Sequence, residues 1–164
     1  MKMSEGVEWG LHCALILGNL PPTTAMPAKA LAELHGVSES YLLKHLKSMT
    51  AAGILESLPG PRGGYRLSRP ATEVTVLDVV DAIEGKGPAF RCTEIRQRGP
   101  FPAPAEICNR KACMISATML RAERAWRDVL RAQTIADLGA EVVSDVEPER
   151  LGKIFDWVRE RTRS

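Results

Sequence analysis

The feature that most constrains the fold is a succession of two helices and a hairpin over residues 27–67. Pro27 stands in the first-turn position that proline favours, and Gly36 follows the apolar stripe as a helix-ending glycine. A second helix is predicted over residues 38–53, with Ser38 as its N-terminal cap. Two helices joined by a short turn that contains glycine are the helix-turn-helix pattern.

Two short extended runs follow, residues 54–58 and 65–67, on either side of the turn PGPRGG. A hairpin directly after a helix-turn-helix is a wing. Apolar periodicity predicts five further helices, over residues 4–17, 73–84, 114–132, 134–143 and 148–161. We therefore expect a mainly α fold with a small β-wing: a winged helix-turn-helix followed by a long amphipathic helix.

Three of the four cysteines lie in the stretch from Cys92 to Cys113, which has no helical or strand period and is rich in proline and glycine. Such a long irregular loop is uncommon in a compact chain. The spacing C-x15-C-x4-C matches neither the paired cysteines of zinc ribbons nor the usual ferredoxin runs. We expect the loop to hold a metal centre, and Cys13, in an apolar helix, to be a core residue.

An iron–sulfur cluster needs more ligands than this loop supplies. Glu8 and His12 are four residues apart and share a face of the first predicted helix, so they are candidates for the missing ligands. Imidazole replaces thiolate in Rieske centres. Spacing alone favours a simpler interpretation, in which Glu8 is an exposed carboxylate and His12 a boundary histidine.

The helix over residues 38–53 and the wing carry the side chains expected to contact DNA. In a helix-turn-helix the start of the second helix enters the major groove, while wing arginines reach the minor groove. The alternative is that these side chains form only a solvated polar face. The candidates are Lys29, Ser38, Ser40, Tyr41, Lys44, His45, Lys47, Arg62, Tyr65 and Arg66. We expect His45 to be a surface or phosphate-facing residue.

Composition excludes several other classes of protein. The net charge of +2 is too small to indicate nucleic-acid binding without the positional argument above. No apolar run approaches the ~20 residues of a membrane span. Glu5 and Glu8 precede the first apolar run and no cleavage pattern follows, so we expect a cytoplasmic protein without a signal peptide. No catalytic triad, nucleotide loop or paired carboxylate site is visible, so we do not expect an enzyme.

Four segments together resemble the Rrf-two family of winged-helix transcriptional regulators, which includes iron–sulfur and nitric-oxide sensors of the IscR and NsrR type. They are VEWGLHCALIL, SESYLLKHLKSMTAAGIL, GPRGGYRLSRPATEVTVLDVVDAIEG and the three-cysteine loop. The similarity covers about residues 1–135, and the wing GGYRLSRP is its most specific part. Glu8-Trp9, His12 and the run CTEIRQRGP are most similar to a redox sensor of that family.

The resemblance implies a homodimer, built on helix 114–132, that binds a palindromic promoter site. It implies an iron–sulfur cluster between protomers, two-iron two-sulfur in the first place and four-iron four-sulfur as the other possibility. Two loop cysteines of one subunit would bind it, with Glu8 and His12 of the other, and Trp9 would relay its charge state. This loop has three cysteines, of which we prefer Cys108 and Cys113 as the direct pair and expect Cys92 to be left out; in a four-iron cluster all three would bind, with Glu8 of the partner.

The expected organisation is a DNA-binding domain over residues 1–84, a cluster-binding loop over 85–113, and a dimerisation helix with C-terminal helices over 114–164. Two other functions remain open. One is a zinc- or thiol-based regulator without a cluster, whose cysteines respond to oxidants directly. The other is an adaptor that uses the winged fold for protein contacts, since a fold does not fix a function.

Overall fold

The computed structural model describes residues 3–60, 63–110 and 113–162. By their internal contacts the residues form two compact units, which are described one at a time. Among the described residues, one unit contains residues 3–85 together with residues 130–162, and is called the winged-helix unit here. The other spans Lys86–Val129 and is called the cysteine unit. The predicted domain boundaries at residues 84 and 113 stay a prediction.

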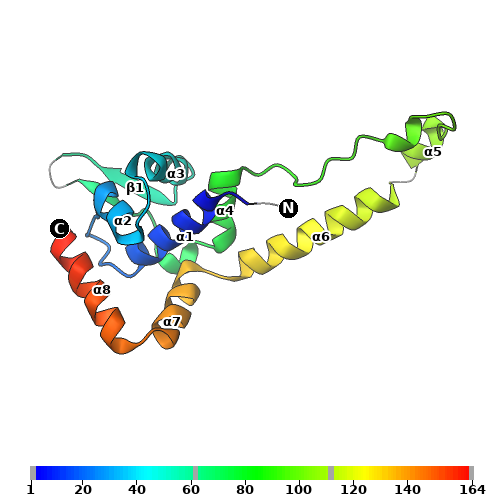
Figure 1. Cartoon of the computed structure of the whole chain (residues 1–164). Helices are drawn as coiled ribbons and strands as arrows, with labels where there is room; N and C mark the ends of the chain where they lie inside the picture. Colours follow the sequence, from blue (N-terminus) through cyan, green and yellow to red (C-terminus); the bar gives the residue numbers. More distant parts are fainter. Residues whose placement is uncertain (1–2, 61–62, 111–112, 163–164) are drawn as a thin grey trace. The chain divides into compact units, whose positions relative to one another are not determined.

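The first three helices of the winged-helix unit are α1 (Glu5–Gly18), α2 (Ala28–His35) and α3 (Glu39–Ala51) (Figure 1). The ends of α2 and α3 confirm the glycines expected there. Gly36 has φ 65° and Gly53 has φ 71°, the left-handed conformation that costs glycine least. Ser38 precedes α3, but its hydroxyl lies 3.1 Å from that of Ser40 and makes no capping bond to the helix.

The wing consists of β1 (Leu55–Leu58) and β2 (Gly64–Leu67), which pair antiparallel with Leu55 opposite Leu67. Met26 and Tyr65 exchange two backbone hydrogen bonds of 2.9 Å, so the segment before α2 adds a bridge to β2. Gly64 allows this approach, because a Cβ there would lie 2.6 Å from the Met26 carbonyl.

After the wing come a 3₁₀ turn, η1 (Ala71–Glu73), and α4 (Val76–Glu84). The helix therefore begins later than the predicted residue 73. In the same unit, α7 (Ile135–Asp145) and α8 (Pro148–Arg161) follow close to their predicted ranges. Helix α1 contacts α3, α4, α7 and strand β2, so it is the central element of this unit. The largest fully buried side chains are those of Met26, Leu31, Leu42, Leu46, Met49, Ile54, Leu55 and Ile135.

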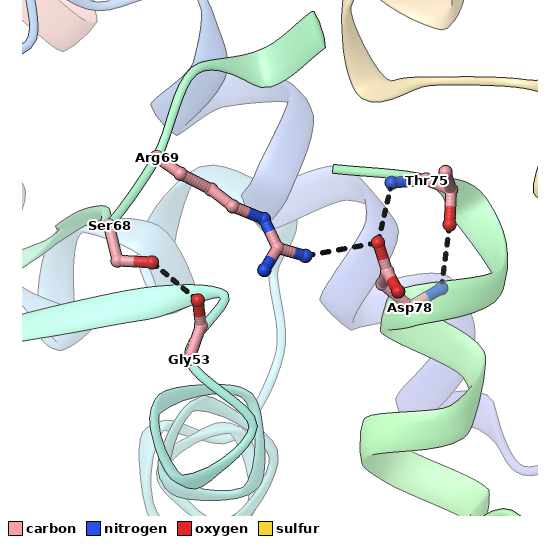
Figure 2. A network of polar contacts seen from close by, with 5 residues as sticks. All are labelled: Gly53, Ser68, Arg69, Thr75 and Asp78. Carbon is pink, nitrogen blue, oxygen red and sulfur yellow. Dashed lines mark hydrogen bonds and ion pairs between the residues drawn. The ribbon is translucent and has the colours of Figure 1, made fainter. Parts of the chain in front are cut away.

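A polar network joins the end of the wing to the start of α4 (Figure 2). One carboxylate oxygen of Asp78 accepts hydrogen bonds from the Thr75 backbone at 2.9 Å and from the Arg69 guanidinium at 3.0 Å. The Asp78 backbone N–H donates in turn to the Thr75 hydroxyl, at 3.1 Å, which completes a capping box. Ser68, next to Arg69, donates to the Gly53 carbonyl at 2.5 Å. The network therefore ties α3, the wing and α4 together.

The cysteine unit contains a 3₁₀ turn, η2 (Ile95–Gln97), a short helix, α5 (Ala105–Arg110), and most of the long helix α6 (Met114–Ala132). The prediction of an irregular stretch from Cys92 to Cys113 is therefore wrong in part. Pro104 precedes α5, and its carbonyl accepts the first hydrogen bonds of that helix, from Ile107 and Cys108. Cys108 thus lies on a helix, and Cys113 directly precedes α6, as expected.

The predicted fold class is confirmed: helices dominate, and a two-stranded antiparallel sheet forms the wing. Among the described residues, none of the helices combines the length and apolar character that crossing a membrane requires. Cys13 is a core residue, as expected, with 0% of its surface exposed. Burial raises the pKa of its thiol to about 12, which keeps it protonated and unreactive.

Candidate functional site

Helix α3 presents an exposed polar face in the position expected of a DNA-reading helix. Ser38, Ser40, Lys44 and Lys47 are exposed, and the Tyr41 ring is 50% exposed. Lys29, on α2, is also exposed. Lysines neutralise phosphates, and hydroxyls bond phosphates or base edges. This face therefore has the chemistry for DNA contact.

Two of the candidate DNA-binding residues lie in the core instead. His45 is 6% exposed and Tyr65 is 8% exposed, so neither side chain is offered to a ligand outside the unit. The expectation that His45 is a surface residue is wrong. The sequence held a signal for its burial, because position 45 lies at helical spacing from Leu42 and Met49, which are both buried.

The two wing arginines among the candidates differ. The Arg66 guanidinium forms an ion pair with Glu56 at 2.9 Å and donates to the Pro22 carbonyl at 3.4 Å. Its charge is therefore partly compensated in this structure. Arg62 lies outside the described residues.

His45 joins α3 to α1. Its ring lies against Gly6, where an added Cβ would collide with three ring atoms. Its Nε2 is buried without a hydrogen-bond partner. Burial is the main cause that lowers the pKa of His45; the nearby Lys44 lowers it further, and Glu84 opposes the shift. A neutral imidazole is the form that this site favours.

Trp9, half-buried on α1, also contacts α3. Its ring meets the Tyr41 ring edge-on at 5.5 Å between centroids and the His45 ring at 6.1 Å. Edge-to-face packing at these separations is favourable. The aromatic cluster Trp9, Tyr41 and His45 therefore connects the helix with the candidate ligands Glu8 and His12 to the candidate DNA-reading helix.

Glu8 and His12 are both exposed on α1. The His12 ring lies 5.4 Å from that of His35, the last residue of α2. Burial lowers the pKa of His35, and the charge of His12 lowers it further. The two candidate ligands are therefore accessible to a group outside the winged-helix unit.

In the cysteine unit the loop thiols gather around one ion pair, Glu94–Arg96. The Arg96 guanidinium lies 2.8 Å from a Glu94 carboxylate oxygen. The Cys92 thiol donates to the other oxygen of that carboxylate at 3.5 Å. Hydrogen bonding to Arg96, to Cys92 and to Cys108 lowers the pKa of the Glu94 carboxyl. Cys92 is exposed, and Cys108 and Cys113 are half-buried. The structure thus brings Cys92 toward Cys108, although we expected Cys92 to be left out of the ligand set; which thiols bind a metal stays a prediction.

Cys113 lies at the start of α6, where backbone N–H groups have no partners within the helix. The N–H groups of Ser116 and Ile115 lower the pKa of the Cys113 thiol, and the positive charge of Arg96 lowers it further. Thiolate is the form that binds metals and reacts with oxidants.

Sequence reasoning missed Glu94 and Arg96. The run CTEIRQR places both between the cysteines, but nothing in the spacing indicates that Glu94 takes the left-handed conformation, φ 49°, that directs its carboxylate. Within residues 3–60, 63–110 and 113–162, no group of three or more histidine, cysteine or acidic side chains is arranged to hold a metal ion. A ligand set divided two and two between protomers requires no such group within one chain.

Comparison with known proteins decides the family. Residues 3–141 match the model of the Rrf2 family, described as iron-dependent transcriptional regulators. The chain belongs to the Rrf2 family. YwgB of Bacillus subtilis (strain 168), named as an HTH-type transcriptional regulator, is 31% identical over 158 residues, which are 96% of this chain and 95% of YwgB. The resemblance inferred from the sequence is confirmed, and this Rrf2 protein is a DNA-binding transcriptional regulator.

Two solved structures show the same fold. T. potens IscR has a TM-score of 0.67 and 20% identity, and the match covers 90% of this chain and 93% of that one. The oxidized form of Staphylococcus aureus CymR has a TM-score of 0.62 and 27% identity, with 85% and 96% covered. The relatives and the family model describe regulators of transcription, not enzymes.

Proposed function

We propose that this Rrf2 regulator is a homodimer that senses redox state, or nitric oxide or iron–sulfur status, through an iron–sulfur cluster bound across its dimer interface. The observation that carries the proposal is the gathering of Cys92 and Cys108 at the Glu94 carboxylate, with Cys113 near Arg96, in a chain of an iron-dependent family. Thiolate, imidazole and carboxylate are a donor set that suits a two-iron two-sulfur cluster, and three thiolates leave a four-iron form possible.

The reason for proposing a dimer is the exposed apolar surface of helix α6. None of the described residues of α6 is buried, although the helix is strongly amphipathic. Its exposed apolar side chains are those of Met114, Ile115, Met119, Leu120 and Val129. Of these, Met114, Ile115, Met119 and Val129 fall on one face of the helix, and exposed apolar side chains gathered on one face indicate an interaction surface. In a two-fold dimer the same stripe meets itself, and two copies of α3 then bind two half-sites of a palindromic promoter sequence.

Cys108 and Cys113 of one subunit, with Glu8 and His12 of the other, would hold the cluster. When bound, it supplies a one-electron change of charge within the interface. Charge changes act strongly where the effective dielectric constant is low. Trp9 directly follows Glu8 and touches Tyr41 and His45, so a displacement at the ligands reaches α3 through ring contacts. Trp9 is therefore the proposed relay.

The test compares DNA binding by the cluster-loaded protein in its oxidised and reduced states, on a fragment of its own promoter at fixed salt. We expect different affinities in the two states, and a smaller difference in Trp9→Ala. Salt must be held constant because phosphate contacts make affinity fall steeply with salt. Equal affinities in a fully loaded protein would remove the redox switch.

A second candidate function is regulation by the thiols themselves, with zinc or without metal. Two observations favour it: the pKa of Cys113 is lowered by backbone N–H groups and Arg96, and S. aureus CymR, which shares the fold, was solved in an oxidized form. Metal analysis after anaerobic purification separates the two functions. Iron with sulfide supports the cluster; zinc, or no metal with DNA binding that responds to peroxide, supports the thiol-based regulator.

A further inference from the structure

Glu94 and Arg96 form an ion pair inside the cysteine loop. Both Nε and Nη2 of Arg96 donate to the same Glu94 oxygen, at 3.2 Å and 2.8 Å. The Arg96 carbonyl accepts a hydrogen bond from the Ala103 backbone N–H at 2.8 Å, which holds the backbone that carries the Arg96 side chain. Glu94 has φ 49°, a left-handed conformation that a residue with a side chain rarely adopts.

A partly exposed ion pair contributes little to stability, so fold stability is a weak reason for this arrangement. Its geometry points to the thiols instead. The second Glu94 oxygen faces Cys92, and the same carboxylate hydrogen-bonds to Cys108. The charge of Arg96 interacts with both Cys108 and Cys113. One cation, held by Glu94, therefore acts electrostatically on the two thiols that are the preferred cluster ligands.

We infer that Arg96, held in place by Glu94, is a positioning residue that sets the reduction potential of the cluster bound at Cys108 and Cys113. This inference rests on the proposed function. A one-electron reductant adds one negative charge to the site without forming or breaking a bond to the protein. A nearby positive charge stabilises that added charge, so Arg96 makes the potential less negative, and Glu94 acts in the opposite direction.

The test is a redox titration of the reconstituted full-length protein, followed by visible absorbance, with iron and sulfide measured in every variant. Arg96→Gln is expected to shift the potential to a more negative value. Arg98→Gln is the matched control, because it removes the same charge two positions further along the chain. The Arg98 side chain is exposed, and it donates a hydrogen bond to the Thr93 carbonyl. Arg96→Lys, which keeps the charge, is expected to restore most of the potential.

Glu94→Gln provides an independent arm if Arg96→Gln fails to assemble the cluster. Removing the negative charge at position 94 is expected to make the potential less negative. Equal shifts in Arg96→Gln and Arg98→Gln, at equal iron and sulfide content, would overturn the role of Arg96, as would an unchanged potential in Glu94→Gln. A wild-type protein that binds no cluster would instead defeat the proposed function, so the two failures are distinguishable.

Discussion

The absence of a side chain at Gly6 allows the His45 ring of α3 to pack directly against α1. The imidazole occupies the space that a Cβ on Gly6 would need. Trp9 and Tyr41 pack against the same ring, at 6.1 Å and 5.4 Å between centroids, so the ring has little freedom to move away. Close packing of this kind transmits small displacements.

Gly6→Ala is therefore expected to destabilise the fold by about 1–3 kcal/mol, the usual cost of overpacking. Gly152→Ala is the control. Position 152 lies within α8 and has open space around it, so alanine there is expected to stabilise by about 0.5–1 kcal/mol. Urea unfolding of both variants measures the difference. A Gly6→Ala protein as stable as wild type would show that the His45 ring yields readily.

His45 also predicts how stability depends on pH. Its pKa is lowered in the folded protein from an ordinary value of 6.5, so below that pH the unfolded chain binds more protons than the folded one. The free energy of unfolding should therefore fall from about pH 7 to about pH 5. His45→Gln should have a shallower slope, with a remainder due to His35, whose pKa is also lowered. Identical slopes in the two proteins would contradict this assignment.

At the scale of elements, two capping boxes of the same design allow a matched comparison. Thr75 with Asp78 begins α4, and Thr134 with Asp137 begins α7. Asp78 also receives a hydrogen bond from Arg69, beyond the end of the wing, whereas Asp137 also receives one from the Thr134 hydroxyl at 2.6 Å (Figure 2). The Asp78 carboxylate therefore both caps the start of α4 and binds Arg69, which follows the wing.

Both Asp78→Ala and Asp137→Ala should lower stability, because each removes the acidic partner of a capping box. The loss from Asp78→Ala should be smaller in an Arg69→Gln background, because the ion pair with Arg69 is then already absent. Thermal unfolding of the four variants completes the cycle. Equal losses from Asp78→Ala in the wild-type and Arg69→Gln backgrounds would contradict the attachment of the wing through Asp78.

The elements that sequence predicted well are those whose signals are local. Gly36 and Gly53 end α2 and α3, and the apolar stripe of α6 places that helix within its predicted bounds. Helix α5 was missed because six residues are too few to show a period. The orientation of Glu94 toward the thiols depends on a left-handed backbone and on Arg96, and neither leaves a pattern in the spacing of the cysteines.

For the whole molecule, the proposed function requires that α6 pair with the same helix of a second copy of the chain. Met119→Glu places a charge in the exposed apolar stripe and should weaken dimer association by about tenfold or more, since charged groups are depleted at interface cores. Arg124→Glu, which lies about 140° around the helix from Met119, should leave association unchanged although it alters the charge by two. Analytical ultracentrifugation over a range of concentrations measures both; equal association would place the interface elsewhere.

The central claim, that this Rrf2 regulator binds a cluster with ligands from both subunits, is tested most directly by iron and acid-labile sulfide counts after anaerobic reconstitution. We predict a coloured dimer with about two irons and two sulfides per chain. Cys108→Ser, Cys113→Ser and His12→Ala should each lose most of the iron and the visible absorbance. A colourless wild-type protein without iron after the same preparation would contradict the claim.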